Sequence, residues 1–279
     1  METRIAKSTD WPILFDFFKQ IYRQGHPLHS REFWEWQYGN DNYGRSFISL
    51  NDSGVITGHV GANFGGGHAW IINVYLNEEC RGKGILGRLY ALAREYYPLA
   101  ATAANDAGLG LYRNMRWYRY HDLIRVVKVN PFLIGRNVNE ICAEVNVYKG
   151  GNSKPLSHYF EQPGIDGILL RDSSTLVNQG KVGGLRLVDV NDIGIVEDFA
   201  WENNFGWVDY VTSWNDLKLK ELYAFGWVND SAAGVPWRLN PIVDNYFCDI
   251  TYLSENQIDR ELIVHRSFSD HGRIGSLYL

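Results

Sequence analysis

Near the start of the chain, apolar residues recur at the spacing of one helix face, after a short alternating segment that ends at Ile5. The members of this face are Ile13, Leu14, Phe17, Phe18 and Ile21. Asp10 stands just before them and can cap a helix, and Pro12 fits the first helical turn. The pattern predicts an opening strand followed by an amphipathic helix.

Beyond this helix, apolar runs of strand length are broken by turn residues and by two further helical patterns. Asn51-Asp52-Ser53-Gly54 is typical of a hairpin turn. One helix presents an apolar face from Leu86 to Tyr96 and is stopped by Pro98. The expected strands cover residues 46–50, 55–64, 70–76, 99–104 and 123–129, and a second helix covers 105–115. The order β-α-β-β-β-α-β-α-β predicts a mixed α/β (α+β) domain with helices flanking a sheet.

A basic, glycine-rich loop connects the strand that ends at Leu76 to the following helix. Backbone N–H groups at the start of a helix are unpaired by the helix itself, and they form a ready anion site where side chains are absent. The loop supplies three glycines, Gly82, Gly84 and Gly87, and three cations, Arg81, Lys83 and Arg88. We therefore expect a phosphate-bearing cofactor to bind here.

The glycine spacing leaves two other interpretations open. Gly82, Gly84 and Gly87 spell G-x-G-x-x-G, the pattern of a dinucleotide-binding turn, and Asp106 stands where that turn expects an acidic residue for the ribose. Against this, five residues from Asn77 to Arg81 separate the strand from the first glycine. A glycine-rich turn with no ligand is the remaining alternative.

The segment Arg81-Gly82-Lys83-Gly84-Ile85 resembles the acetyl-CoA loop of the GNAT (Gcn5-related N-acetyltransferase) superfamily. Downstream, Asn105 is followed seven residues later by Tyr112, which is similar to the second signature of that family. The resemblance covers residues 1–125. It departs from the family pattern at three places, namely Leu86 for the second glycine or alanine, Glu78 for a proline, and Arg116-Trp117 for Gly-Phe.

This resemblance implies the order of strands and helices found above, a largely antiparallel sheet, and acetyl-CoA (coenzyme A) as cofactor. The implied cofactor-binding residues are Val74, Tyr75, Leu76, Arg81, Gly82, Lys83, Gly84, Ile85, Leu86, Gly87, Arg88 and Asn105. Backbone N–H groups of Val74 and Leu76 would polarise the thioester carbonyl, and Tyr112 would be the catalytic acid that protonates the leaving thiolate. The alternative for Tyr112 is a packing role against Trp117. No general base stands out among His26, Glu32, Glu35, His59 and His68.

The C-terminal half shows a weak internal repeat. With a shift of 182 positions, Arg4 and Asp10 fall on Arg186 and Asp192, with similar apolar residues after them. No counterpart of the basic loop follows. The repeat predicts a partial, degenerate GNAT-like unit. The expected domains are a GNAT acetyl-CoA-binding catalytic domain over 1–130, a connecting segment over 131–184, and the degenerate unit over 185–279.

Composition narrows the function classes. The net charge of −5 argues against nucleic-acid or membrane-surface binding, and a content of 45% apolar and 21% charged residues is globular. Cys80, Cys142 and Cys248 form no C-x-x-C pair, so we expect no metal site. The N-terminus lacks a secretory pattern, which favours a cytoplasmic protein.

We therefore expect an acyl-CoA-dependent N-acetyltransferase that acts on an amine of a small polar acceptor. Aromatic residues cluster at 33–38 and 201–210, which favours a nucleotide-linked amino sugar as the acceptor. The alternatives are a non-catalytic sensor that binds coenzyme A or a nucleotide, and a dinucleotide-dependent enzyme. We expect no nucleic-acid or membrane partner, and a homodimer is left open.

Overall fold

The computed structural model describes residues 1–103, 106–133, 163, 167–178, 183–230 and 251–264. Within this part the chain forms two compact units. The first takes Met1–Tyr120 and Tyr252–Leu262, and the second takes His121–Thr251 and Ile263–Ser267. The expected boundaries at residues 130 and 184 stay a prediction, and the structure adds that a segment near the end of the sequence belongs to the first unit.

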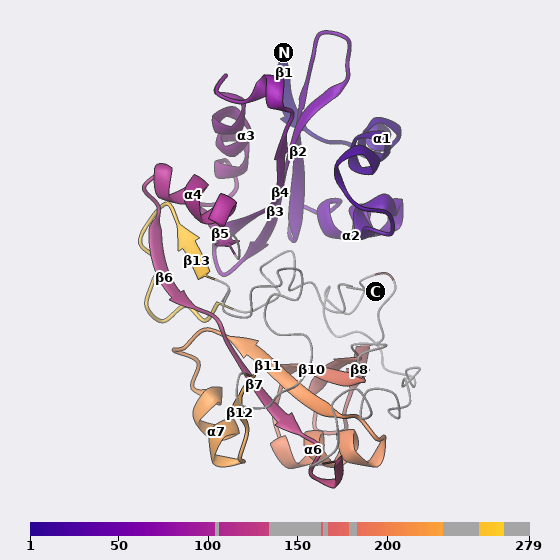
Figure 1. The fold of residues 1–279 in the computed structure, drawn as a ribbon, viewed down its shortest axis with the longest axis vertical. Helices are drawn as coiled ribbons and strands as arrows, with labels where there is room; N and C mark the ends of the chain where they lie inside the picture. The colour runs from indigo at the N-terminus through magenta and orange to yellow at the C-terminus, as the bar shows by residue number, and fades with distance from the viewer. Residues whose placement is uncertain (104–105, 134–162, 164–166, 179–182, 231–250, 265–279) are drawn as a thin grey trace. The chain divides into compact units, whose positions relative to one another are not determined.

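The first unit is built on a seven-stranded sheet with the order β1-β2-β3-β4-β5-β13-β6 (Figure 1). Its strands are β1 (Glu2–Ile5), β2 (Gly44–Leu50), β3 (Ile56–Gly65), β4 (His68–Leu76), β5 (Leu99–Ala103), β6 (Tyr118–Asp122) and β13 (Thr251–Ser254). The first four strands pair antiparallel, and β5 pairs with β4 in parallel. The parallel pair is connected by a helix, as a crossover between parallel strands requires.

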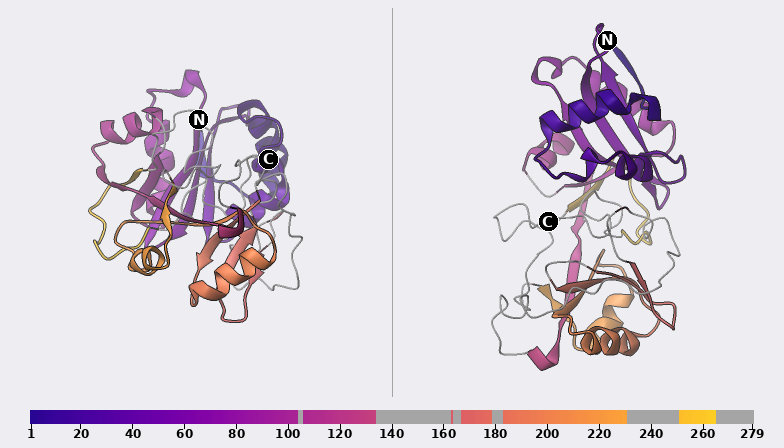
Figure 2. Two further views of the ribbon diagram at one scale, coloured as in Figure 1. Left: turned by 60° about the horizontal axis from the view of Figure 1, so that its bottom comes forward. Right: turned by 90° about the vertical axis from the view of Figure 1, so that its right-hand side faces the viewer.

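Helices cover both faces of this sheet, α1 and α2 on one side and α3 and α4 on the other (Figures 1 and 2). Their bounds are α1 (Trp11–Ile21), α2 (Arg31–Tyr38), α3 (Ile85–Arg94) and α4 (Asp106–Asn114). Among the described residues, the single 3-10 turns are η1 (Ser8–Asp10), η2 (Pro27–His29), η3 (Glu78–Cys80) and η4 (Pro131–Leu133). Each face has its own buried apolar cluster, with Phe18 of α1 central to one and Leu89 of α3 to the other. The predicted mixed, largely antiparallel fold is confirmed.

Helix α2 was not expected, and it explains the first aromatic cluster. Trp34 and Tyr38 lie on its inner face and are 1% exposed. In the second cluster, Phe205 and Trp207 are equally buried. Because these rings fill cores, they do not support the expected role in binding a ring-shaped acceptor.

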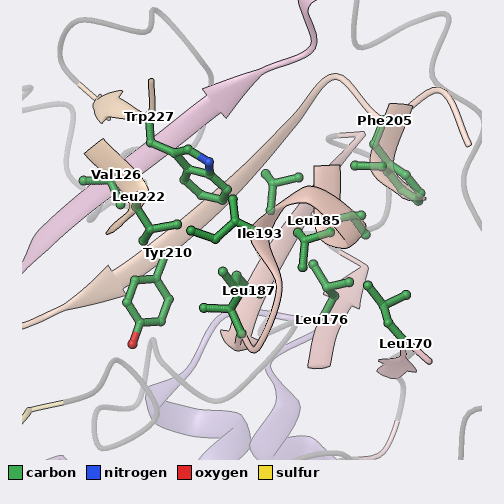
Figure 3. Packing of buried hydrophobic residues seen from close by; sticks show 14 of the residues in the cluster. Val126, Leu170, Leu176, Leu185, Leu187, Ile193, Phe205, Tyr210, Leu222 and Trp227 are labelled. Carbon is green, nitrogen blue, oxygen red and sulfur yellow. The ribbon is translucent and has the colours of Figure 1, made fainter. Parts of the chain in front are cut away.

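The second unit has a six-stranded sheet with the order β12-β7-β11-β10-β9-β8. Its elements are β7 (Ile124–Val129), β8 (Gly167–Leu169), β9 (Thr175–Asn178), β10 (Gly184–Asp189), α6 (Ile193–Glu202), β11 (Trp207–Thr212), α7 (Lys218–Ala224) and β12 (Val228–Asn229). Figure 3 shows its core, in which Val126 of β7 packs near Leu222 of α7 and Trp227. As in the first unit, two strands connected by a helix, here β10 and β11, pair in parallel.

The series β10-α6-β11-α7-β12 of the second unit repeats the series β4-α3-β5-α4-β6 of the first. The ends of α4 and α7 show this most clearly. The N–H of Trp117 bonds to the carbonyl of Tyr112 at 3.1 Å, and the N–H of Trp227 bonds to the carbonyl of Leu222 at 3.0 Å. The two hydrogen-bonded pairs are related by a sequence shift of 110 positions. The predicted shift of 182 instead pairs the edge strand β1 with the central strand β10. The second unit therefore repeats part of the first at a shift of 110 positions and not at the predicted 182.

The two units exchange one strand each. In the first sheet, β13 lies between β5 and β6, although in the chain it follows all the strands of the second sheet. In the second sheet, β7 lies between β11 and β12, although it directly follows β6. The two inserted strands occupy equivalent positions. β13 lies between the last two strands of the series β4-β5-β6, and β7 lies between the last two strands of the series β10-β11-β12. The expected single strand over 123–129 is in fact β7 of the second unit.

Side-chain contacts hold both exchanged strands. On the first unit, Leu253 of β13 is 3% exposed in the core, and the Glu255 carboxylate accepts hydrogen bonds from Arg94 at 2.7 Å and from the Leu99 N–H at 2.8 Å. On the second, the fully buried Arg125 of β7 donates to Asp209 at 2.7 Å. Burial alone would raise the pKa of Asp209, but the guanidinium groups beside it hold that pKa at about 2. Removing one partner of such a pair is strongly destabilising.

The strand exchange predicts how the first unit can be made independent. A fragment of residues 1–130 lacks β13, leaves β5 and β6 without their shared neighbour, and should be insoluble. The Thr251 hydroxyl bonds to the Asp122 carboxylate, so the end of β6 and the start of β13 are adjacent. Residues 1–122 joined by a short glycine-rich linker to residues 251–262 should then be soluble and unfold cooperatively, as measured by circular dichroism. Cooperative unfolding of the unmodified fragment 1–130 would contradict the role of β13.

Candidate coenzyme site of the first unit

The candidate site begins where β4 and β5 stop pairing. Their registered pairs run from Ala69 opposite Leu99 to Ile71 opposite Ala101, whereas β4 continues to Leu76. Among the described residues, the last part of β4 therefore has a partner strand on its β3 side only. Its backbone groups on the β5 side are available to a ligand.

A β-bulge decides which backbone groups these are. Two residues, Asn73 and Val74, lie between the pairs Gly61–Ile72 and His59–Tyr75, opposite the single residue Val60. Asn73 has φ +50°, a left-handed conformation that asparagine tolerates better than most residues. The extra residue reverses the alternation of the strand beyond it.

The reversal is visible in the hydrogen bonds on either side of the bulge. Before it, the N–H of Ala69 donates toward β5, to the Pro98 carbonyl at 2.9 Å. After it, the N–H of Asn77 donates toward β3, to the Thr57 carbonyl at 2.9 Å. Because amide directions alternate along a strand, the N–H groups of Val74 and Leu76 face the β5 side. These are the two groups that the sequence analysis expected to contact a thioester carbonyl.

The loop between β4 and α3 has the conformation that a phosphate site requires. Gly82 and Gly84 have φ +74° and +71°, in the left-handed region that favours glycine. A Cβ atom at Gly82, Gly84 or Gly87 would meet no other described atom within 4 Å, so these positions are open. Gly84 is also the N-cap of α3 and provides no side-chain capping bond. The first N–H groups of α3 are thus accessible to phosphate oxygens.

Positive charge borders this loop. Lys83 and Arg88 are exposed, and Arg81 donates to the Leu76 carbonyl at 3.3 Å and lies 3.7 Å from Glu78. Ile85, by contrast, is buried and anchors the first turn of α3 in the core, while Leu86 and Tyr75 are partly buried. The residues present therefore fit a pyrophosphate, since backbone donors and side-chain cations converge on one exposed loop.

Tyr112 lies on the inner face of α4 and is 4% exposed. Its ring stacks on Trp117 with centroids 4.6 Å apart, which is the packing role considered above. Burial and the neighbouring Tyr112 raise the pKa of Tyr90, on α3, well above its ordinary value. Tyr112 is therefore fixed in position by its neighbours, and its role as an acid stays a prediction. Asn105 lies outside the described residues.

The general-base candidates separate into one buried group and four at or near the surface. His59 is fully buried, and both its ring nitrogens lie within 2.8 Å of a polar partner. Burial lowers its pKa to about 4, so it is neutral at physiological pH and has no path to an amine. His26, Glu35 and His68 each make a local hydrogen bond, and Glu32 lies in the first turn of α2. The structure singles out none of these four.

The equivalent turn of the second unit does not have these features. Only Val190, Asn191 and Asp192 separate β10 from α6. The Asp192 carboxylate caps α6 by accepting from the Ile195 N–H at 3.2 Å, which places a negative charge where a phosphate would bind. Leu222 takes the position of Tyr112 in the repeat. The described part of the second unit therefore has no equivalent coenzyme site.

The described part of the chain shows neither a metal-binding cluster nor a membrane-spanning helix. No group of three or more His, Cys, Asp or Glu residues there could hold a metal ion. Cys80 is buried in η3 as a free thiol. No helix in that part has the length and apolar character needed to cross a membrane.

The first unit is similar to known acetyltransferases. The model of the acetyltransferase (GNAT) family matches residues 11–115. A putative acetyltransferase from Pyrococcus horikoshii matches 98% of this chain and 92% of its own, with 14% identity and a TM-score of 0.51. The GNAT-family acetyltransferase of Staphylococcus aureus Mu50 matches 43% of this chain and 85% of its own, with 14% identity and a TM-score of 0.36. No curated protein matches the sequence.

Residues 11–115 therefore match the GNAT acetyltransferase family, whose cofactor is acetyl-CoA. A further similar structure, the phosphinothricin acetyltransferase of Sinorhizobium meliloti, is in complex with acetyl-CoA; it has 17% identity and a TM-score of 0.35, over 44% of this chain and 77% of that one. The likeness to the Pyrococcus protein extends the shared fold over both units.

Replacing Gly84 tests the loop. Gly84→Val places a branched side chain in the path of the pyrophosphate, and it should abolish coenzyme A binding measured by isothermal titration. Gly54→Val is the matched control, because Gly54 has φ +77° and is equally open but lies in the β2–β3 turn. Both variants should lose roughly 1–2 kcal/mol of stability from the left-handed backbone. Normal binding by Gly84→Val would place the phosphates elsewhere.

Proposed function

We propose that the chain is an N-acetyltransferase that moves the acetyl group of acetyl-CoA to an amine of a small polar acceptor. The observation that carries this proposal is the bulge in β4, which directs the N–H groups of Val74 and Leu76 to the side where β5 no longer pairs. A backbone donor at this position suits a carbonyl oxygen that gains negative charge as an amine attacks.

Acetyl-CoA supplies an activated thioester carbonyl. The protein's own contribution begins with the loop over residues 81–87, which anchors the phosphates and so fixes the position of the thioester along β4. The Val74 and Leu76 amides then polarise the carbonyl, and the Tyr112 hydroxyl donates a proton to the departing sulfur. The structure singles out no described carboxylate or imidazole for the proton of the amine, so we assign that step to water.

The acceptor is defined only as a small polar amine. A nucleotide-linked amino sugar was expected from the aromatic clusters, but Trp34, Tyr38 and Trp207 are buried and support it no longer. A dinucleotide is disfavoured because η3 lies between β4 and Gly82, where the dinucleotide turn needs a direct entry. A coenzyme sensor without turnover stays the alternative from another class.

Coenzyme selectivity separates these candidates. Acetyl-CoA or coenzyme A should raise the melting temperature, since a ligand that binds only the folded state stabilises it by about 2.7 kcal/mol at a hundredfold excess over Kd. NAD and NADP should have no effect. Titration should give one coenzyme per chain, because the α6 turn carries Asp192 in place of the loop. Two sites per chain, or a shift with NAD alone, would contradict the assignment.

Turnover separates an enzyme from a sensor. Tyr112→Phe should keep coenzyme affinity and lose roughly 10²–10⁴-fold in turnover, because only the proton donor is removed. Tyr223→Phe, in the equivalent helix of the second unit, is the control and should lose only a surface hydrogen bond to Asn229. Unchanged turnover in Tyr112→Phe would make Tyr112 a packing residue. Tight coenzyme binding with no acetylation across a broad amine panel would favour the sensor.

A further inference from the structure

The bulge in β4 is an unfavourable local structure that needs support. It breaks the β3–β4 ladder and holds Asn73 at φ +50°. Left-handed residues other than glycine are rare in strands and persist where surrounding contacts determine them. The supporting contacts come from three neighbouring side chains, those of His59, Ser46 and Tyr38.

His59 makes the contact to the bulge itself. Its Nδ1 lies 2.8 Å from the carbonyl oxygen of Asn73, and its Nε2 lies 2.7 Å from the Ser46 hydroxyl. A carbonyl can only accept, so Nδ1 carries the hydrogen and donates, and Nε2 accepts from Ser46. In this single tautomer, the His59 ring on β3 is hydrogen-bonded to Ser46 of β2 and to Asn73 of β4.

The surroundings keep the ring fixed in this arrangement. His59 is 0% exposed, and the Phe18 ring packs edge-on against it with centroids 5.0 Å apart. Tyr38 is a second ring neighbour at 6.0 Å, and its hydroxyl accepts a hydrogen bond from the Asn73 side chain at 2.8 Å. Both the carbonyl and the side chain of Asn73 are therefore held from the side of the sheet opposite α3.

We infer that His59 is a positioning residue for coenzyme binding: by holding the Asn73 carbonyl, it sets the bulge that directs the Val74 and Leu76 amides at the thioester. The inference rests on the proposed function of this site. It assigns His59 an indirect role, in contrast to the general-base role considered from the sequence. It also accounts for a buried polar residue in a sheet interior, where an apolar residue would otherwise pack at lower cost.

Two substitutions of His59 each keep one of its two hydrogen bonds and remove the other. The side-chain N–H of asparagine can take the place of Nδ1, so His59→Asn keeps a donor for the Asn73 carbonyl. The longer glutamine places its amide near the position of Nε2, so His59→Gln keeps the Ser46 contact and loses the bulge. We expect His59→Gln to weaken coenzyme A binding by about tenfold or more, the size of one or two hydrogen bonds, and His59→Asn to recover most of the affinity. Isothermal titration with coenzyme A measures both.

The control is Thr57→Val, which removes another buried hydroxyl of β3, 2.9 Å from Ser49 and away from the bulge. It should lower the melting temperature and leave coenzyme A affinity unchanged. In the absence of coenzyme, hydrogen exchange at the Val74 and Leu76 amides, followed by NMR, should change in His59→Gln and stay close to the original in His59→Asn.

The outcomes separate the inference from the function on which it rests. Equal coenzyme affinity in His59→Asn and His59→Gln, with equal amide exchange at Val74 and Leu76, would overturn the role of His59. If the original protein failed to bind coenzyme A, the proposed function would be wrong, and the amide exchange would still show whether His59 holds the bulge.

Discussion

The hydrogen bond between the buried His59 ring and the Asn73 carbonyl is the interaction on which the site depends. It stabilises one extra residue in β4, and that residue reverses the direction of every amide beyond it. Without the bulge, the N–H groups of Val74 and Leu76 would face β3 and form hydrogen bonds within the sheet. With it, they face the side where β5 has stopped pairing. The sheet thus gains backbone donors on its β5 side.

The same first unit depends on a strand from the far end of the chain. β13 fills the gap between β5 and β6, and Glu255 beyond it binds both the end of α3 and the start of β5. The helix and strand that border the site are therefore secured by residues that follow all the strands of the second sheet in the chain. The second unit receives β7 in return, and Arg125 of β7 is buried against Asp209. This reciprocal exchange gives the second unit a structural function although Asp192 and Leu222 replace the residues of the coenzyme site.

Sequence patterns predicted the elements that depend on local signals. The helix after Asp10, the hairpin at residues 51–54 and the strand–loop–helix unit around Gly84 all formed as expected, because capping, turn and glycine chemistry act within a few residues. The family of the first unit could be predicted for the same reason.

What the sequence did not reveal depends on distant contacts. The bulge at Asn73 follows from hydrogen bonds to β3, and no residue pattern within β4 marks it. The strand exchange leaves no local signal either, because the sequences of β7 and β13 predict strands but not the sheet in which each strand pairs. The repeat at a shift of 110 positions was visible in principle, since Asn105-Asp106 and Trp117 recur as Asn215-Asp216 and Trp227. The stronger apparent match at 182 positions obscured it.

The central claim is that the coenzyme meets the β4 amides beyond the bulge. The most direct measurement is an NMR titration of the full chain, labelled with ¹⁵N at valine and leucine, with coenzyme A. We predict that the Val74 and Leu76 amide resonances shift with the coenzyme concentration, while that of Val190, in the equivalent turn of the second unit, does not. Binding of coenzyme A with no change at Val74 and Leu76 would contradict the account.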